Sequence, residues 1–169
     1  MITRYRIVEV KTLSNYVRYS LSHNKIFHTS KDAVREADSI ANSLIEQNPN
    51  LKKFKFITND SDFESCSDNF IYRVIVISNA RVITSIYIYP LECHDNDIRY
   101  TYRDANIVWE KNKFNVYLAG FNIDYFPVLP EALTFIDSLI FSCELQNSCD
   151  LPNSDIINNR KKLGGYWND

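Results

Sequence analysis

The chain has 169 residues, of which 45% are hydrophobic and 24% are charged, with a net charge of −2 and a pI of about 5.9. This composition excludes a largely disordered chain, because it supplies enough apolar residues for one domain to bury a sizeable core. The pI also argues against a protein dedicated to nucleic-acid binding.

Charge is distributed unevenly along the sequence. Residues 1–57 carry ten Lys/Arg and five Asp/Glu, a net +5, whereas residues 58–169 carry nine and sixteen, a net −7. A basic end on an acidic body would steer a charged partner. The alternative is that these charges lie on solvated faces and have no partner role.

The first residues of the chain and its apolar runs do not indicate a membrane or secreted protein. Residues 1–11 contain two arginines with no continuous apolar segment after them, unlike a signal peptide. The longest apolar stretch, residues 70–90, is interrupted by Arg73 and Arg81 and is too polar to cross a bilayer. The four cysteines lack CxxC spacing, so we expect thiols in a soluble, cytoplasmic protein.

The first third of the chain predicts three strands and a helix. Residues 4–11 and 16–22 mix β-branched and aromatic side chains with charges at strand-like spacing, and residues 26–27 begin a short third strand. A helix is predicted to begin at Ser30, whose hydroxyl would cap the first turn, and to end before Pro49. The helical face spaced for burial consists of Ala33, Ala37, Ile40, Ala41 and Leu44.

The middle of the chain predicts more strands. Residues 51–58, LKKFKFIT, alternate lysine with phenylalanine and indicate a half-buried strand. The acidic residues 59–69 indicate a loop. Residues 70–78 and 81–89 are apolar runs that face each other as a hairpin across Asn79 and Ala80.

The segments that follow are shorter. Residues 90–97 begin with a proline and indicate a loop, and residues 98–103, IRYTYR, indicate a strand. A further hairpin is predicted between residues 107–114 and 115–118, around Lys111, Asn112 and Lys113.

Two strand-to-helix junctions resemble each other. Residues 126–139, FPVLPEALTFIDSL, align without a gap with residues 27–40, FHTSKDAVREADSI, so that Asp137 matches Asp38. Each half reads as strand, turn, strand, short strand and helix, which indicates an internal repeat; chance similarity between two such junctions is the alternative. Both aspartates lie beside a buried helical face, where we expect a structural role. The second helical face consists of Ala132, Leu133, Ile136, Leu139, Ile140 and Cys143.

The predicted fold is therefore α+β, a mainly antiparallel sheet with two helices packed on one face and two β-β-β-α repeats. Residues 1–143 are expected to form one domain, with repeat units at 4–47 and 106–143 on either side of the central hairpin. Residues 144–169 have no convincing period and are expected to form an irregular tail.

The sequence carries little catalytic chemistry. The polar cluster ECHDND, from Glu92 to Asp97, contains metal-ligand residue types, but adjacent Cys93 and His94 would project to opposite sides of an extended chain. With three glycines in all, no phosphate-binding loop or glycine-bounded nucleophile is present. We expect no enzyme, no cofactor and no metal, with a hydrolase around ECHDND as the third-ranked alternative.

Nucleic-acid binding is the second-ranked function. Arg99 and Arg103 with Thr101 lie on one face of RYTYR and two tyrosines on the other, and the first third of the chain is basic. Stacking rings and phosphate-binding cations are typical of single-strand binding, but the alternation separates the two residue types.

Protein binding is the function that the sequence favours. Eleven tyrosines supply amphipathic contact area, and the acidic loops would complement a basic partner. We expect a small stoichiometric inhibitor, such as an immunity protein or a phage-encoded anti-defence protein, that occludes a partner surface. The candidate contact residues are Asp60, Asp62, Glu64, Asp68, Glu92, Asp95, Asp97, Tyr100 and Tyr102.

Overall fold

The computed structural model of the chain describes residues 1–12, 18–57 and 70–147, with the backbone alone for 18–23 and 140–147. Within these ranges nine strands and two helices are present, and the predicted α+β class with a mainly antiparallel sheet is confirmed. In chain order the elements are β1 (Ile2–Thr12), β2 (Arg18–Phe27), α1 (Ser30–Gln47), β3 (Lys52–Ile57), β4 (Tyr72–Ser78), β5 (Arg81–His94), β6 (Arg99–Tyr102), β7 (Ala105–Glu110), β8 (Lys113–Leu118), β9 (Phe121–Phe126) and α2 (Leu129–Asn147).

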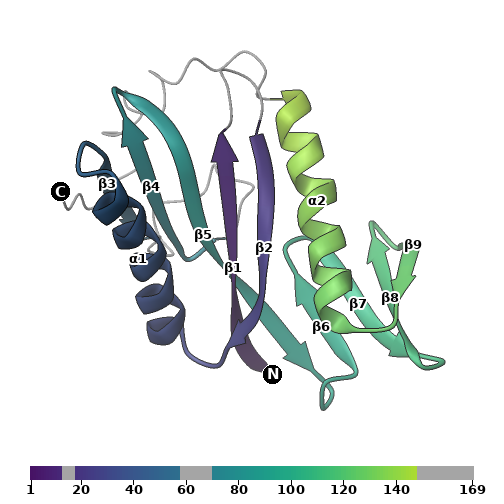
Figure 1. The fold of residues 1–169 in the computed structure, drawn as a ribbon. Helices are drawn as coiled ribbons and strands as arrows, with labels where there is room; N and C mark the ends of the chain where they lie inside the picture. Colours follow the sequence, from purple (N-terminus) through teal and green to yellow (C-terminus); the bar gives the residue numbers. More distant parts are fainter. Residues whose placement is uncertain (13–17, 58–69, 148–169) are drawn as a thin grey trace.

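The sheet forks at β5, which has 14 residues and is the longest strand described. One edge of β5 pairs with β1 along its length, and the other edge pairs first with β4 and then with β6. β2 lies outside β1, β3 lies outside β4, and β7, β8 and β9 follow β6 in order. One branch therefore ends at β3 and the other at β9 (Figure 1).

Pro90 lies inside β5 at the point where its neighbour changes from β4 to β6. The N–H of Ile71 donates to the C=O of Ile88, so even-numbered residues of β5 direct their backbone polar groups toward this edge. The last pair with β4 is at Ile88 and the first with β6 is at Leu91. The missing N–H of Pro90 therefore faces a gap, and the strand loses no ladder hydrogen bond there.

The predicted loop over residues 90–97 is consequently wrong for most of its length. Glu92, Cys93 and His94 belong to β5, and only the residues that follow form a turn. Asp95, Asn96 and Asp97 all have positive φ, a conformation that Asn and Asp tolerate better than most residues.

The two helices cover opposite faces of β1 and β5. Ile7 and Ile88 pack in the core beneath α1, whereas their neighbours Val8 and Tyr89 pack in the core beneath α2. Successive side chains of a strand point to opposite faces, so the prediction that both helices pack on one face is wrong. The physical reason is that β5 is apolar on both faces, and such a strand needs cover on both.

α2 lies between the two ends of the longest run of paired strands, which goes from β2 through β1 and β5 to β9. β2 is on one side of it and β8 and β9 are on the other, so this run of strands curves around the helix (Figure 1). The core beneath α2 consists of Val8, Phe70, Tyr89, Leu91, Cys93, Tyr100, Tyr102, Ala105, Ile107, Val116, Leu129, Ala132, Leu133 and Ile136. Neither described helix is long and apolar enough to span a membrane.

α1 packs through small side chains. Ala33, Ala37 and Ala41 are fully buried, which allows the helix backbone to approach the sheet closely. The predicted end before Pro49 is confirmed at Gln47, but the N-cap is Thr29 rather than Ser30: the N–H of Asp32 donates to Thr29 Oγ1 at 3.1 Å.

The two strand-to-helix junctions share their geometry. Phe27 and Phe126 each end a strand, and the following helix begins three residues later in both cases. Residues 18–27 form one strand, however, so the first unit has two strands before its helix where three were predicted. α2 continues to Asn147, past the predicted start of the tail, and residues 148–169 lie outside the described residues. The repeat itself stays a prediction.

Candidate functional site

Four aromatic side chains form a row across the end of the sheet and onto α2. Trp109 pairs with Phe114 between β7 and β8, with ring centroids 4.5 Å apart, and Phe114 pairs with Phe126 on β9. Phe126 in turn contacts Phe135 of α2, at 5.0 Å between ring centroids. We call these four residues the aromatic row.

The aromatic row runs from the edge of the core beneath α2 to the surface. Trp109 is 36% exposed, and the other three rings are half-buried. Ile98, whose C=O accepts from the N–H of Trp109, is 48% exposed at one end, and Val128 is 47% exposed near the other. Large apolar side chains that are held next to one another and exposed are typical of binding surfaces.

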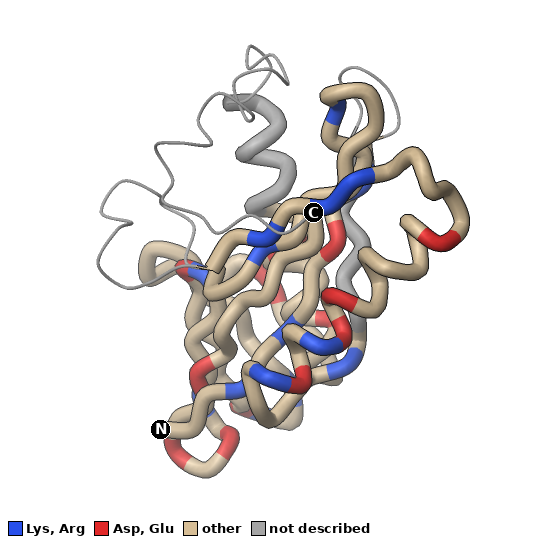
Figure 2. Tube along the Cα trace, turned by 90° about the vertical axis from the view of Figure 1, so that its left-hand side faces the viewer, with Lys and Arg blue, Asp and Glu red and all other residues tan. Residues whose placement is uncertain are grey.

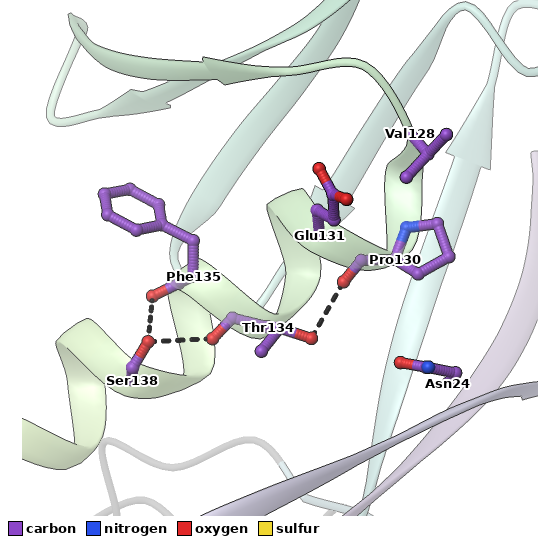
Figure 3. A pocket seen from close by; sticks show the side chains of 7 residues that line it. All are labelled: Asn24, Val128, Pro130, Glu131, Thr134, Phe135 and Ser138. Carbon is purple, nitrogen blue, oxygen red and sulfur yellow. Dashed lines mark hydrogen bonds between the residues drawn. The ribbon is translucent and has the colours of Figure 1, made fainter.

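A groove of about 630 Å³ adjoins the aromatic row. Figure 3 shows it between Asn24 of β2 and the first turns of α2. Phe135 belongs to both the aromatic row and the groove, so the two form one continuous surface. The residues that line the groove are Asn24, Val128, Pro130, Glu131, Thr134, Phe135 and Ser138.

The hydroxyl groups of the groove donate their protons to the α2 backbone. Thr134 Oγ1 donates to the Pro130 carbonyl and Ser138 Oγ to the Thr134 carbonyl, each at 2.9 Å. Glu131 is the charged residue among those that line the groove; its side chain is exposed and has no ion-pair partner among the described residues. The groove therefore presents three apolar side chains, three neutral polar side chains and one carboxylate.

A second exposed carboxylate borders the aromatic row. Asp124 lies two residues before Phe126 on β9, on the same face of the strand, and it too has no ion-pair partner in the described part of the chain. Its Oδ1 accepts from the N–H of Tyr125 at 2.8 Å. Glu131 and Asp124 therefore border the groove and the β9 end of the aromatic row, whereas Lys111 and Lys113 lie beside its Trp109 end.

The outer edge of β9 is less suited to binding than the aromatic row. Among the described residues nothing pairs with this edge. Asp124 occupies the Tyr125 N–H, and a register shift opposite Val116 and Tyr117 bends the strand. Both features are common protections against edge-to-edge pairing. Side-chain contacts are therefore the better basis for recognition here.

A buried ionic cluster holds α2 in place beside the groove. Asp137, 1% exposed, accepts from Arg6 Nε and Arg103 Nη1 at 3.2 Å and from the Tyr102 hydroxyl at 2.8 Å. Arg6 Nη2 also donates to Thr134 Oγ1 at 2.9 Å. These bonds connect β1 and the end of β6 to α2, in agreement with the structural role predicted for Asp137.

The two tyrosines predicted as contact residues are in the core. Tyr102 is fully buried and Tyr100 is 5% exposed, so their prediction as exposed contacts is wrong. Burial and the nearby Asp97 carboxylate raise the pKa of Tyr100 to about 12. Burial and Asp137 also raise the pKa of Tyr102 well above its usual value. Arg103, from the same RYTYR segment, is buried with them, and so the residues cited for nucleic-acid binding are not on one surface.

The predicted acidic contacts fall into two groups. Asp60, Asp62, Glu64 and Asp68 lie outside the described residues. Asp95 pairs with Arg99, and Asp97 pairs with Arg4 at 3.4 Å; both acids are in a turn beside the N-terminus (Figure 2). These two carboxylates already have partners, unlike those that border the aromatic row.

Glu92 lies next to the one histidine of ECHDND. His94 Nε2 is 3.1 Å from Thr101 Oγ1 and 3.8 Å from Glu92 Oε2. The same nitrogen faces both groups, whereas a base that activates a hydroxyl needs its second nitrogen oriented by the acid. In the described ranges no group of three His, Cys, Asp or Glu could hold a metal ion.

The sequence indicated one part of the aromatic row, namely the hairpin that brings Trp109 and Phe114 together. A two-residue turn at Lys111 and Asn112, both with positive φ, places Trp109 opposite Phe114. The hairpin was predicted around Lys111, Asn112 and Lys113, but its register was not predicted. The contact of Phe126 with Phe135 depends on the tertiary fold, and no local pattern indicates it. Comparison with protein-family models, curated proteins and solved structures found no match.

Proposed function

We propose that this protein is a non-enzymatic protein-binding module whose contact surface is the aromatic row with its adjoining groove. The observation that carries the proposal is the continuity of this surface. Trp109 contacts Phe114, Phe114 is paired with Phe126 across β8 and β9, and Phe126 contacts Phe135, which also lines the groove. Aromatic residues are enriched in the centres of protein interfaces, and tryptophan is prominent among the residues that dominate binding energy.

The mode of action that we propose is occlusion of the partner's surface in a stoichiometric complex, as an inhibitor would act. The scaffold supports this mode because the rings sit on paired strands and on a helix held by the buried Asp137 cluster. A surface held in one conformation loses little entropy on binding. Immunity and anti-defence inhibitors remain the class of protein that we propose.

The experiment is affinity capture from the native cells with three forms of the protein. The wild type is compared with the double variant Trp109→Lys, Val128→Lys, which changes exposed side chains at both ends of the surface. Ile57→Lys, on β3, is the control, because Ile57 is 48% exposed and far along the sheet from the aromatic row.

We expect one stoichiometric protein partner with the wild type and with Ile57→Lys, and its loss with the double variant. A partner retained by the double variant contradicts the proposed surface. Capture of RNA or DNA in place of a protein contradicts the proposed function.

A further inference from the structure

The groove beside α2 has the chemistry of a cation-binding subsite. Thr134 and Ser138 direct their hydroxyl protons to backbone carbonyls of the helix, and the Asn24 amide is the other neutral polar group that lines the groove. The Oγ1 of Thr134 also accepts from Arg6. The exposed charge in the groove is the Glu131 carboxylate, which is an acceptor only.

The walls of the groove suit the hydrocarbon part of a long basic side chain. Val128, Pro130 and Phe135 line it beside Glu131. Lysine and arginine place their methylene groups on apolar surface while their charged group remains in contact with water or a carboxylate. A volume of about 630 Å³ also admits such a side chain without rearrangement of the helix.

We propose that the groove receives a lysine or arginine side chain of the protein partner, with its charged group at Glu131, while an adjacent apolar residue of the same segment contacts the aromatic row. This inference rests on the proposed function and specifies the partner: a segment that is both basic and apolar. Asp124, at the border of the aromatic row, also favours a positive charge on the partner segment.

The test begins with photo-cross-linking in the native cells. A benzophenone amino acid replaces Asn24 to report on the groove, Trp109 to report on the aromatic row, or Ile57 as a remote control. The cross-linked partner segments are then sequenced. We expect the groove and row positions to capture the same protein, the groove position to link next to a lysine or arginine, and Ile57 to capture nothing.

Purified partner is then titrated against Glu131 variants. We expect Glu131→Gln to weaken binding by about tenfold or more, as for loss of a hydrogen bond to a charged group, and Glu131→Lys to weaken it further. Glu46→Gln, an exposed acid on α1, is the matched control and should leave affinity unchanged.

Each failure has a separate meaning. Capture from Trp109 without capture from Asn24, a linked segment without a basic residue, or unchanged affinity of Glu131→Gln overturns the subsite and leaves protein binding in place. Absence of capture from both positions overturns the subsite and the proposed function together.

Discussion

Asp137 is the residue on which the position of α2 most depends. It is buried between Arg6 and Arg103, and the removal of one member of a buried ion pair leaves uncompensated charge in the interior. We expect Asp137→Ala to lower the free energy of unfolding by about 3–5 kcal/mol.

Asp38 on α1 provides the matched comparison. It holds the equivalent position in the sequence alignment and accepts from Tyr72 and Lys55, but its side chain is 23% exposed. Water can therefore replace part of the hydrogen bonding that Tyr72 and Lys55 lose. We expect Asp38→Ala to lower the free energy of unfolding by only about 1–2 kcal/mol. Urea denaturation of both variants measures the difference, and equal losses would show that the cluster around Asp137 has no special role.

Tyr100 predicts a loss of stability at high pH. Its pKa is raised by burial from 10.0 to about 12, so between these values the native state keeps a phenol proton that the unfolded chain has lost. The contribution of this difference to the free energy of unfolding is complete below pH 10. It is lost as the pH rises toward 12, at about 1.4 kcal/mol per pH unit.

The Tyr100→Phe variant tests this contribution. Its free energy of unfolding should fall less steeply than that of the wild type between pH 10 and 12. Tyr125→Phe, at a ring that is 59% exposed, serves as the control. Identical slopes for wild type and Tyr100→Phe would contradict the burial of this hydroxyl.

At the level of elements, the start of α1 gives a local test. Thr29 accepts from the N–H of Asp32, and loss of an N-cap costs about 1 kcal/mol. We expect that loss for Thr29→Ala, whereas Ser30→Ala should change the free energy of unfolding by less than about 0.5 kcal/mol. Thermal unfolding of both variants distinguishes the two caps, and a larger effect at Ser30 would favour the cap predicted from the sequence.

Elements with a local pattern were predictable. The hairpin of β4 and β5 follows from two apolar runs around Asn79 and Ala80, and both turn residues have positive φ in the structure. The alternation in β3 also predicted its geometry: Phe54 and Phe56 are buried, while Lys55 contacts Asp38 of α1.

Elements whose geometry depends on distant neighbours were not predictable. From the sequence alone, Pro90 predicts the end of a strand. β5 nevertheless continues, because Pro90 lies between the segments that pair with β4 and with β6, where no hydrogen bond from its nitrogen is needed. Likewise, the face that each helix covers depends on which of Ile7 and Val8 points toward it, and the sequence shows only that both are apolar.

For the molecule as a whole, the described residues of the basic first third do not gather into a basic surface. β1 lies in the middle of the sheet with Arg6 fully buried, and Arg4 and Lys55 pair with acids from other segments. Blue and red positions are accordingly interspersed along the described chain (Figure 2). Glu131 and Asp124, which have no ion-pair partner among the described residues, are exposed beside the groove and the aromatic row.

This arrangement predicts a salt effect on association. Glu131 and Asp124 should attract a basic partner, and attraction between exposed charges is screened over about 10 Å at 0.1 M salt. We expect the association rate constant to fall as ionic strength rises, and the fall to be smaller for the double variant Glu131→Gln, Asp124→Asn. Stopped-flow or surface-based kinetics with the captured partner measures it, and an association rate that is independent of salt contradicts a basic partner.

The central claim, that the aromatic row and groove form the partner interface, is tested most directly by amide hydrogen exchange of the protein with and without its captured partner. We predict slower exchange on binding in β7, β8, β9 and the first half of α2, with β3 and β4 unchanged. Protection confined to the Asp95–Asp97 turn, or to the face of β3 and β4, would contradict the proposed interface.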